Sequence, residues 1–207
     1  MGGRPSRELI VTKDKLMIKS KDIGFTDHLR PINTLILLND GCFATCSEDD
    51  CIKVIDPKKN FRYVRYIKAK TNGVTSICQL EDGTISSSSI DNSITIGNYT
   101  IPHAHQDFIY AIITLPNNRI ASCSSDESIK IWKSNPPYSD TPIKELKGHE
   151  YSVFSLLYIK EKDIMISGSV DETIRFWNMS TYQCESVISC LHSYGVHSIY
   201  QIDCDRV

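Results

Sequence analysis

The stretch Ile166-Ser167-Gly168-Ser169-Val170-Asp171-Glu172-Thr173-Ile174-Arg175-Phe176-Trp177-Asn178 decides the fold. Its β-branched and aromatic residues favour strands, and the Asp-Glu pair in the middle favours a turn. We therefore expect two short strands joined by a tight turn. Nearly the same pattern occurs earlier, as Ser122-Cys123-Ser124-Ser125-Asp126-Glu127-Ser128-Ile129-Lys130-Ile131-Trp132. A hairpin that recurs in this way indicates a protein built from repeats.

Four aspartates mark a repeat that runs through the chain. They are Asp49, Asp91, Asp126 and Asp171, and they lie 42, 35 and 45 residues apart. Each has a serine two residues before it, a hydroxyl residue four before it and an isoleucine three after it. In chain order these residues are Ser47, Ser89, Ser124 and Ser169; Thr45, Ser87, Ser122 and Ser167; and Ile52, Ile94, Ile129 and Ile174.

A histidine opens most of the units. His28, His105 and His149 precede their aspartates by 21, 21 and 22 residues, and His192 would open a further copy. Lys70 stands where the second unit would have its histidine. An apolar segment follows each opening position, and a turn signal follows the segment, as expected for strands joined by hairpins. The expected first strands include residues 32–35, 74–77, 109–112, 153–156 and 196–199.

Each unit is predicted to contain four strands. Candidate fourth strands cover residues 63–68, 143–147 and 184–189, and the second unit is compressed, with a tight hairpin at 96–99 and a very short fourth strand. We predict a flexible N-terminus over residues 1–8 and a repeat domain over 9–207, in which 9–19 form a remnant hairpin. The units cover about 28–69, 70–104, 105–148 and 149–191, with a partial unit over 192–207.

Composition and charge narrow the class of partner. The 207 residues carry 23 basic and 25 acidic side chains, a net charge of −2, whereas a nucleic-acid-binding domain is expected to present a basic face. No apolar run approaches the roughly 18 residues of a membrane span, and the N-terminus lacks a signal-peptide stretch. We expect a cytoplasmic protein, with the nucleus as the alternative, and neither a nucleic acid nor a membrane as its partner.

Two short patterns have a functional and an ordinary interpretation. Gly2 and Ser6 fit the myristoylation pattern, but that pattern is short and common, so an ordinary flexible start is favoured. The basic segment at residues 58–63 is interpreted as a solvated loop between strands rather than as a nucleic-acid site.

The eight cysteines are expected to be free thiols. None forms a C-x-x-C pair, and most lie in apolar, strand-like runs that suit small buried side chains. Cys42 and Cys46 would lie about 13 Å apart on one face of a strand, too far apart for two ligands of one ion. His103 and His105 could form a metal pair, but His105 belongs to the repeat pattern. We therefore predict no metal site and no cofactor.

The repeat resembles the WD40 family over about residues 28–207, most clearly over 105–191. The match is carried by four short strands, a period near 42 residues, Gly148-His149 at the opening and Trp177-Asn178 at the close. Ile55 and Gly97 replace the closing tryptophan in the first two units. The resemblance implies an all-β propeller of four-stranded blades.

The chain length bears on whether such a propeller closes. A seven-bladed ring would need roughly 290 residues, so we expect a partial arc of about four complete blades with part-blades at both ends. A five-blade ring closed by pairing of the N-terminal hairpin with residues 196–202 is the alternative. An open arc would leave unpaired strand edges and favour self-association.

The resemblance also implies a hydrogen-bonded network inside each blade. Its complete sets would be His105, Ser122, Asp126 and Trp132, and His149, Ser167, Asp171 and Trp177. A catalytic triad has the same residue types, but the order and spacing fit the structural network, and no nucleophile elbow is present. We therefore predict no catalytic residue and no enzymatic activity.

The resemblance implies partner binding on the rim where the first strand starts and where residues flank the turn aspartate. The alternative is that the aromatics among them pack between blades. The candidate residues are Phe108, Tyr110, Ser125, Ser152, Phe154, Gly195, His197, Glu48, Asp50, Glu127, Val170 and Glu172.

The predicted function is a non-catalytic scaffold that binds partner proteins or peptides. A narrower alternative is a substrate-receptor or adaptor subunit of a ubiquitin-ligase or signalling complex, although neither an F-box-like segment nor a Trp-Asp-x-Arg signature is present. A propeller-type hydrolase is the third class. It would need a cluster of carboxylates or histidines at repeat-consistent positions, and we identify none.

Overall fold

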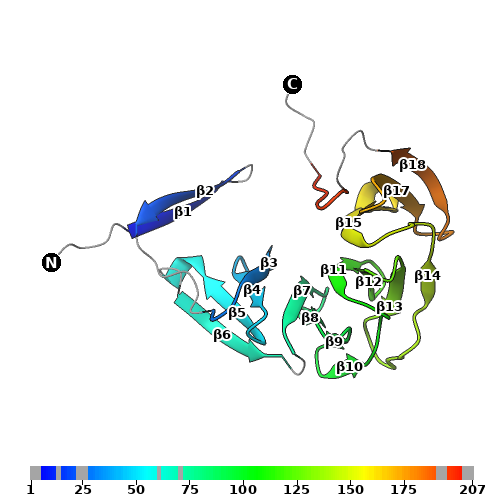
Figure 1. Cartoon of the computed structure of the whole chain (residues 1–207). Helices are drawn as coiled ribbons and strands as arrows, with labels where there is room; N and C mark the ends of the chain where they lie inside the picture. Colours follow the sequence, from blue (N-terminus) through cyan, green and yellow to red (C-terminus); the bar gives the residue numbers. More distant parts are fainter. Residues whose placement is uncertain are drawn as a thin grey trace.

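The computed structural model is all-β and describes residues 6–12, 15–21, 28–59, 62–69, 72–189 and 195–201. Four four-stranded antiparallel sheets follow one another along the chain and lie side by side in an arc (Figure 1). The predicted fold class, a series of propeller-type blades, is confirmed. In each blade the first strand lies toward the centre of the arc and the fourth lies outside (Figure 1).

Blades 1 and 2 come from the first half of the chain. Blade 1 consists of β3 (Ile32–Leu37), β4 (Phe43–Ser47), β5 (Cys51–Asp56) and β6 (Arg62–Lys68), with the short 3-10 helix η1 (Pro57–Lys59) before β6. Blade 2 consists of β7 (Val74–Gln79), β8 (Ile85–Ser89), β9 (Ile94–Ile96) and β10 (Tyr99–Ile101). The short β10 is the compressed fourth strand that the sequence predicts.

Blades 3 and 4 carry the clearest copies of the repeat. Blade 3 consists of β11 (Ile109–Leu115), β12 (Arg119–Ser124), β13 (Ile129–Lys133) and β14 (Lys144–Leu146). Blade 4 consists of β15 (Val153–Ile159), β16 (Ile164–Ser169), β17 (Thr173–Asn178) and β18 (Cys184–Ser189), with η2 (Lys160–Lys162) between β15 and β16.

The two ends of the chain differ in detail from the prediction. An antiparallel pair, β1 (Ser6–Thr12) with β2 (Lys15–Lys21), lies where a hairpin over 9–19 is expected, and it begins inside the segment predicted as flexible. Gly2 and His192 lie outside the described residues. The strand expected over 196–199 is not formed, because no neighbouring strand pairs with it within the described residues. Among those residues no strand pair joins β1 or β2 to this segment, so no ring closure is seen.

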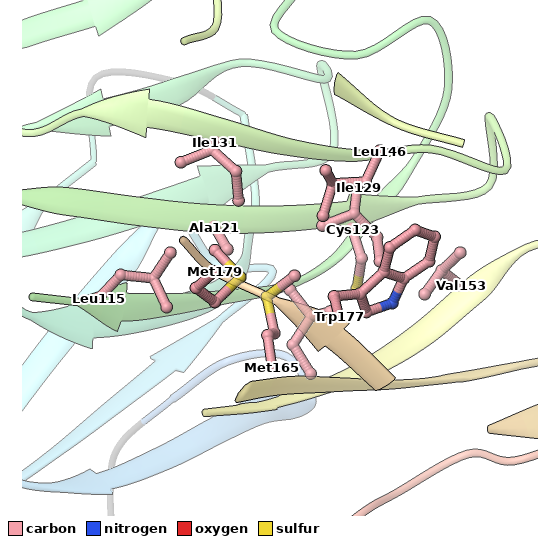
Figure 2. Close-up of a cluster of buried hydrophobic side chains, with 11 residues drawn as sticks. Leu115, Ala121, Cys123, Ile129, Ile131, Leu146, Val153, Met165, Trp177 and Met179 are labelled. Atoms are coloured by element: carbon pink, nitrogen blue, oxygen red, sulfur yellow. The ribbon is translucent and has the colours of Figure 1, made fainter. Parts of the chain in front are cut away.

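The core lies between neighbouring blades. One cluster joins blade 1 to blade 2 and a second joins blade 2 to blade 3. The third, between blades 3 and 4, packs Trp177, Met165 and Met179 of blade 4 against Ile129 and Ile131 of blade 3 (Figure 2). The back faces of blades 2, 3 and 4 therefore each pack on the front face of the preceding blade.

A long loop of blade 3 covers the short outer strand of blade 2. Tyr138 stacks on Tyr99, with 4.7 Å between ring centroids and 11° between ring planes. The hydroxyl of Tyr99 donates a hydrogen bond to Asp140 in the same loop. The segment Pro136-Pro137-Tyr138 thus packs against a neighbouring blade.

Two side chains of the first strand of blade 1 are exposed on its back face. Ile32 is 45% exposed and Leu35 49% exposed. The residues at the position of Ile32 in the other blades are Val74, Ile109 and Val153, and all three are 0% exposed. The same sequence position therefore contributes to a blade interface in three units and to the surface in one.

This contrast gives a paired prediction for stability. Ile109→Ala should lower the free energy of unfolding by about 2–5 kcal/mol, because it empties a packed interface. Ile32→Ala should lower it by less than about 1 kcal/mol, because half of that side chain is already in water. Chemical denaturation of both variants checks this, and equal losses would contradict the front-to-back packing described here.

Candidate protein-binding rim

The two predicted histidine sets are each brought together within one blade. In blade 4, His149 Nδ1 lies 2.7 Å from Asp171 Oδ2 and His149 Nε2 lies 2.7 Å from Ser167 Oγ. Trp177 Nε1 donates to the same Ser167 oxygen at 2.8 Å. In blade 3 the corresponding distances are 2.8, 2.7 and 2.8 Å for His105, Ser122, Asp126 and Trp132.

The geometry fits a neutral histidine. The Nδ1 proton is then donated to the carboxylate, and Nε2 accepts the serine proton, so every polar group has a partner. A protonated Nε2 would instead leave the serine proton without an acceptor in the network. Burial lowers the pKa of both His105 and His149, and the hydrogen bond and charge of the aspartate only partly oppose it.

The aspartates remain ionised although they are partly buried. Burial by itself would raise the pKa of Asp171, but hydrogen bonds from Thr173, His149 and the backbone N–H of Glu150 outweigh it and lower the pKa to about 2. The same balance at Asp126, with donors from His105, Ser128 and the N–H of Gln106, holds its pKa well below its ordinary value. Each carboxylate thus gathers several donors at one turn.

This arrangement has the residue types of a hydrolytic triad but no access for a substrate. Ser122 and Ser167 are 0% exposed. Each serine oxygen also accepts a tryptophan N–H, so it is hydrogen-bonded to both the indole and the imidazole. The network therefore fits a structural role.

The structure extends the network to residues that the sequence reasoning did not include. In blade 1, His28 Nδ1 lies 2.8 Å from Asp49 Oδ2 and Nε2 lies 3.1 Å from Thr45 Oγ1, with Ile55 in place of the tryptophan. A hydroxyl two residues after the aspartate also donates to it at 2.6 Å in the other three blades, from Ser93, Ser128 and Thr173. Both kinds of residue recur at fixed distances from the turn aspartate, so the sequence repeat itself could have identified them.

The repeated serine two residues before each aspartate connects two loops. Its hydroxyl donates to a carbonyl in the segment before the first strand, at 2.6–3.1 Å, and it accepts the backbone N–H of the aspartate at 3.0–3.4 Å. The four pairs of serine and carbonyl residue are Ser47 with Arg30, Ser89 with Asn72, Ser124 with Asp107, and Ser169 with Tyr151. The serine therefore holds the two loops of one rim together in all four blades.

A β-bulge occurs at the same place in every blade. The pairing of the first two strands skips one residue of the first strand, directly after its first residue. A bulge bends the strand and redirects the side chain of the extra residue. The bulged residues are Asn33, Thr75, Tyr110 and Phe154.

The predicted rim aromatics form a continuous row of rings across blades 3 and 4. The centroid distances are 5.0 Å from Phe108 to Tyr110, 4.4 Å from Tyr110 to Phe154 and 4.6 Å from Phe154 to His197. The three aromatics are half-buried and His197 is exposed. They pack on one another between blades and also keep part of their surface in solvent. Partner binding by these rings stays a prediction.

Two hydroxyls join the row. Ser125 Oγ donates to the Tyr110 hydroxyl at 3.2 Å, and Ser152 Oγ donates to Ser125 Oγ at 3.3 Å. Gly195 lies against Val170, so close that an added Cβ would be 2.4 Å from the Val170 Cα. The predicted residues Phe108, Tyr110, Ser125, Ser152, Phe154, Val170, Gly195 and His197 are thus gathered at one end of blades 3 and 4.

Acidic side chains flank this row. Glu127 and Glu172 follow the turn aspartates, and both are exposed and adopt positive φ, 68° and 63°. Asp50 and Asn92 have the same backbone conformation in the other two blades. A left-handed conformation is uncommon for glutamate and is often retained where its side chain is used.

Glu48 and Asp50 lie apart from the aromatic row. They line a shallow groove between blades 1 and 2 together with Leu29, Gly73 and Ile90, and Asp50 accepts a hydrogen bond from the Gly73 N–H. The twelve predicted rim residues therefore fall into two patches.

Four-stranded blades in an arc, three of them with a histidine–aspartate hydrogen bond, define a repeat protein of the propeller class. The chain belongs to the WD40 family: the family model "WD domain, G-beta repeat" matches residues 20–56, 98–133 and 140–178. The second and third matched segments each begin at an outer strand of one blade and end with the third strand of the next. One sequence repeat therefore supplies the outer strand of one blade and the first three strands of the next, which links the two blades covalently.

Several named proteins are similar to parts of the chain. The nuclear distribution protein nudF of Aspergillus niger is 42% identical over 76 residues, which are 36% of this chain and 17% of that protein. The ribosome biogenesis protein WDR12 homolog of Nematostella vectensis is 22% identical over 79% of this chain and 41% of its own length. The ubiquitin homeostasis protein lub1 of Schizosaccharomyces pombe is 38% identical over 36% of this chain and 10% of its own.

The chain thus spans less than half the length of each of these relatives. Their names describe distribution, biogenesis and homeostasis proteins rather than enzymes, and the WD40 family is usually non-catalytic. In the described part of the chain, no group of three or more His, Cys, Asp or Glu side chains is placed to hold a metal ion. The described segments also contain no helix that is long and apolar enough to cross a membrane.

Neighbouring carboxylates in blade 4 give a test of the network. Asp171→Ala should lower the free energy of unfolding by about 1–3 kcal/mol, because it leaves buried donors without an acceptor. Glu172→Ala removes an exposed carboxylate and should change stability by less than about 0.5 kcal/mol. Thermal melting of the two variants compares them, and equal shifts would argue against the network.

The same network predicts how stability depends on pH. The pKa values of His149 and Asp171 lie below their ordinary values of 6.5 and 3.8 in the folded protein, so the unfolded chain binds more protons. The free energy of unfolding should be level above neutral pH, decrease as pH falls below 6.5, and decrease again below 3.8. Denaturant titrations across this range measure it, and unchanged stability below pH 6.5 would contradict neutral buried histidines.

Proposed function

We propose that this chain is a non-catalytic scaffold that binds partner proteins or peptides at the rim of blades 3 and 4. The observation that carries the proposal is the bulge in each first strand, because it turns one side chain per blade away from the regular strand register. In blades 3 and 4 that side chain is aromatic, and the rings continue into Phe108 and His197. Clustered aromatics are typical of the residues that supply most binding energy at interfaces.

The charge around the row indicates what the partner presents there. Glu127 and Glu172 are exposed, and neither carboxylate forms an ion pair within the described residues. A lysine or arginine of the partner could bind a carboxylate and lie over an aromatic face in one site. We infer a basic segment of a partner protein as the ligand of this patch.

A second candidate is a substrate-receptor or adaptor subunit of a ubiquitin-ligase or signalling complex. Its support is the partial similarity to a protein named for ubiquitin homeostasis. A propeller-type hydrolase is less well supported, because the serines of the histidine networks are fully buried. We further propose a cytoplasmic location with the nucleus as the alternative, repeat units over about 28–69, 70–104, 105–148 and 149–191, and self-association through open strand edges.

Phe154 and Tyr138 form a matched pair for testing the rim. Both are half-buried aromatics that stack on a neighbour, but Tyr138 belongs to the outer loop. In quantitative affinity capture from source cells, Phe154→Ala should lose proteins that wild type and Tyr138→Ala both retain, by about tenfold or more for a hot-spot residue. Equal capture by all three proteins would contradict the rim as the binding surface.

A further inference from the structure

The outer strand of blade 1 is a long free edge. Strand β6 has seven residues and β18 of blade 4 has six, whereas the corresponding strands β10 and β14 have three each. It pairs with β5 on one side and with no other strand in the described part of the chain. Figure 1 shows it on the outside of the arc, away from the inner strands. Such an edge presents unpaired backbone N–H and C=O groups in the spacing of a strand.

The segment that contains this edge is strongly basic. From Pro57 to Leu80 the sequence has no aspartate or glutamate, and it has six of the 23 basic residues of a chain whose net charge is −2. Arg65 and Lys68 of β6 and Lys58 and Lys59 of η1 are exposed. Of these four, only Lys59 has an ion pair in the described residues, at 3.9 Å from Asp56.

Apolar surface accompanies the charge on the same strand. Val64 is 45% exposed and Tyr66 is 53% exposed. The pairing of β6 with β5 skips Val64, so a bulge lies there and the Val64 side chain leaves the regular alternation of the strand. The Tyr66 hydroxyl lies 2.9 Å from Cys51 Sγ on the neighbouring strand, which restrains the ring while most of it remains in solvent. The edge therefore combines backbone groups, cations and exposed apolar side chains.

These features favour one kind of ligand. A second copy of this edge would bring like charges together, which is destabilising when strands pair. A segment with acidic side chains would have opposite charges at the same positions, and its backbone could pair with the free edge. A nucleic acid would contact the cations but has no strand backbone to pair with the edge.

We propose that β6 binds an acidic segment of a partner protein in extended conformation, added as a fifth strand of blade 1. This site is on the outer side of the arc and is independent of the aromatic rim. The backbone supplies directional hydrogen bonds, Arg65 and Lys68 supply the charge preference, and Val64 and Tyr66 supply apolar contact.

The probes are two synthetic peptides, one of alternating glutamate and valine and one of alternating lysine and valine. Fluorescence anisotropy should show binding of the glutamate peptide only, weakened by added salt. Hydrogen exchange of the amides of residues 62–68 should slow in the complex. The double variant Arg65→Glu with Lys68→Glu should weaken binding by about tenfold or more, or about 1.4 kcal/mol.

The matched control is Lys160→Glu with Lys162→Glu, which makes the same change of charge at exposed positions of η2 in blade 4. It should bind like wild type, and so should Phe154→Ala, which separates this site from the rim. Circular dichroism establishes that each variant is folded. Absence of binding, equal weakening by both charge variants, or binding without protection of 62–68 would overturn the proposal, as would tighter binding of a single-stranded oligonucleotide at the same residues.

Discussion

The buried hydrogen bond between histidine and aspartate is the interaction on which blades 1, 3 and 4 depend. An imidazole and a carboxylate out of water are costly unless each is hydrogen-bonded. In blades 3 and 4 a series of hydrogen bonds runs from tryptophan through serine and histidine to aspartate, and it gives each of these side chains a partner. It joins the loop before the first strand, the second strand, the turn and the third strand, although the histidine and aspartate are 21 or 22 residues apart. A short β-sheet with little core of its own thereby acquires a defined shape at one end.

The blades differ in how completely they carry this network, and packing replaces part of it. Blade 1 keeps the histidine and aspartate but has Ile55, a fully apolar and buried residue, at the tryptophan position. In blade 2, Asp91 is bonded by Ser93, and the loop of blade 3 lies over the short outer strand through Tyr138. Hydrophobic contact between blades is therefore shared along the arc, so that a unit with a weaker internal network is supported by its neighbours.

Much of the fold follows from the repeat, because hydroxyl, aspartate and isoleucine recur in one register and strand length is encoded locally. The bounds of β18 and the short β10 agree with the sequence pattern. The bulges could not be predicted from the repeat, since a bulge requires no particular residue type at the extra position. Neither does the contact of Tyr110 with Phe154, which are 44 residues apart and meet only because two blades pack side by side. The strand expected at 196–199 shows the limit of local propensity: a strand needs a neighbour to pair with, and propensity alone does not provide one.

The bulge separates two kinds of sequence constraint. The residues directly before and after the bulge must remain apolar or small to keep the blades packed. The bulged residue itself differs in chemistry from blade to blade, although the strand pairing around it is the same. It is an amide, a hydroxyl, a phenol and a phenyl ring in turn, at Asn33, Thr75, Tyr110 and Phe154. The bulged position therefore accepts different side chains, and each makes its own contact: Asn33 donates to the carbonyl of Val74, and Thr75 is hydrogen-bonded to Ser88. The binding surface of such an arc can therefore change at one blade without a change in strand pairing at the others.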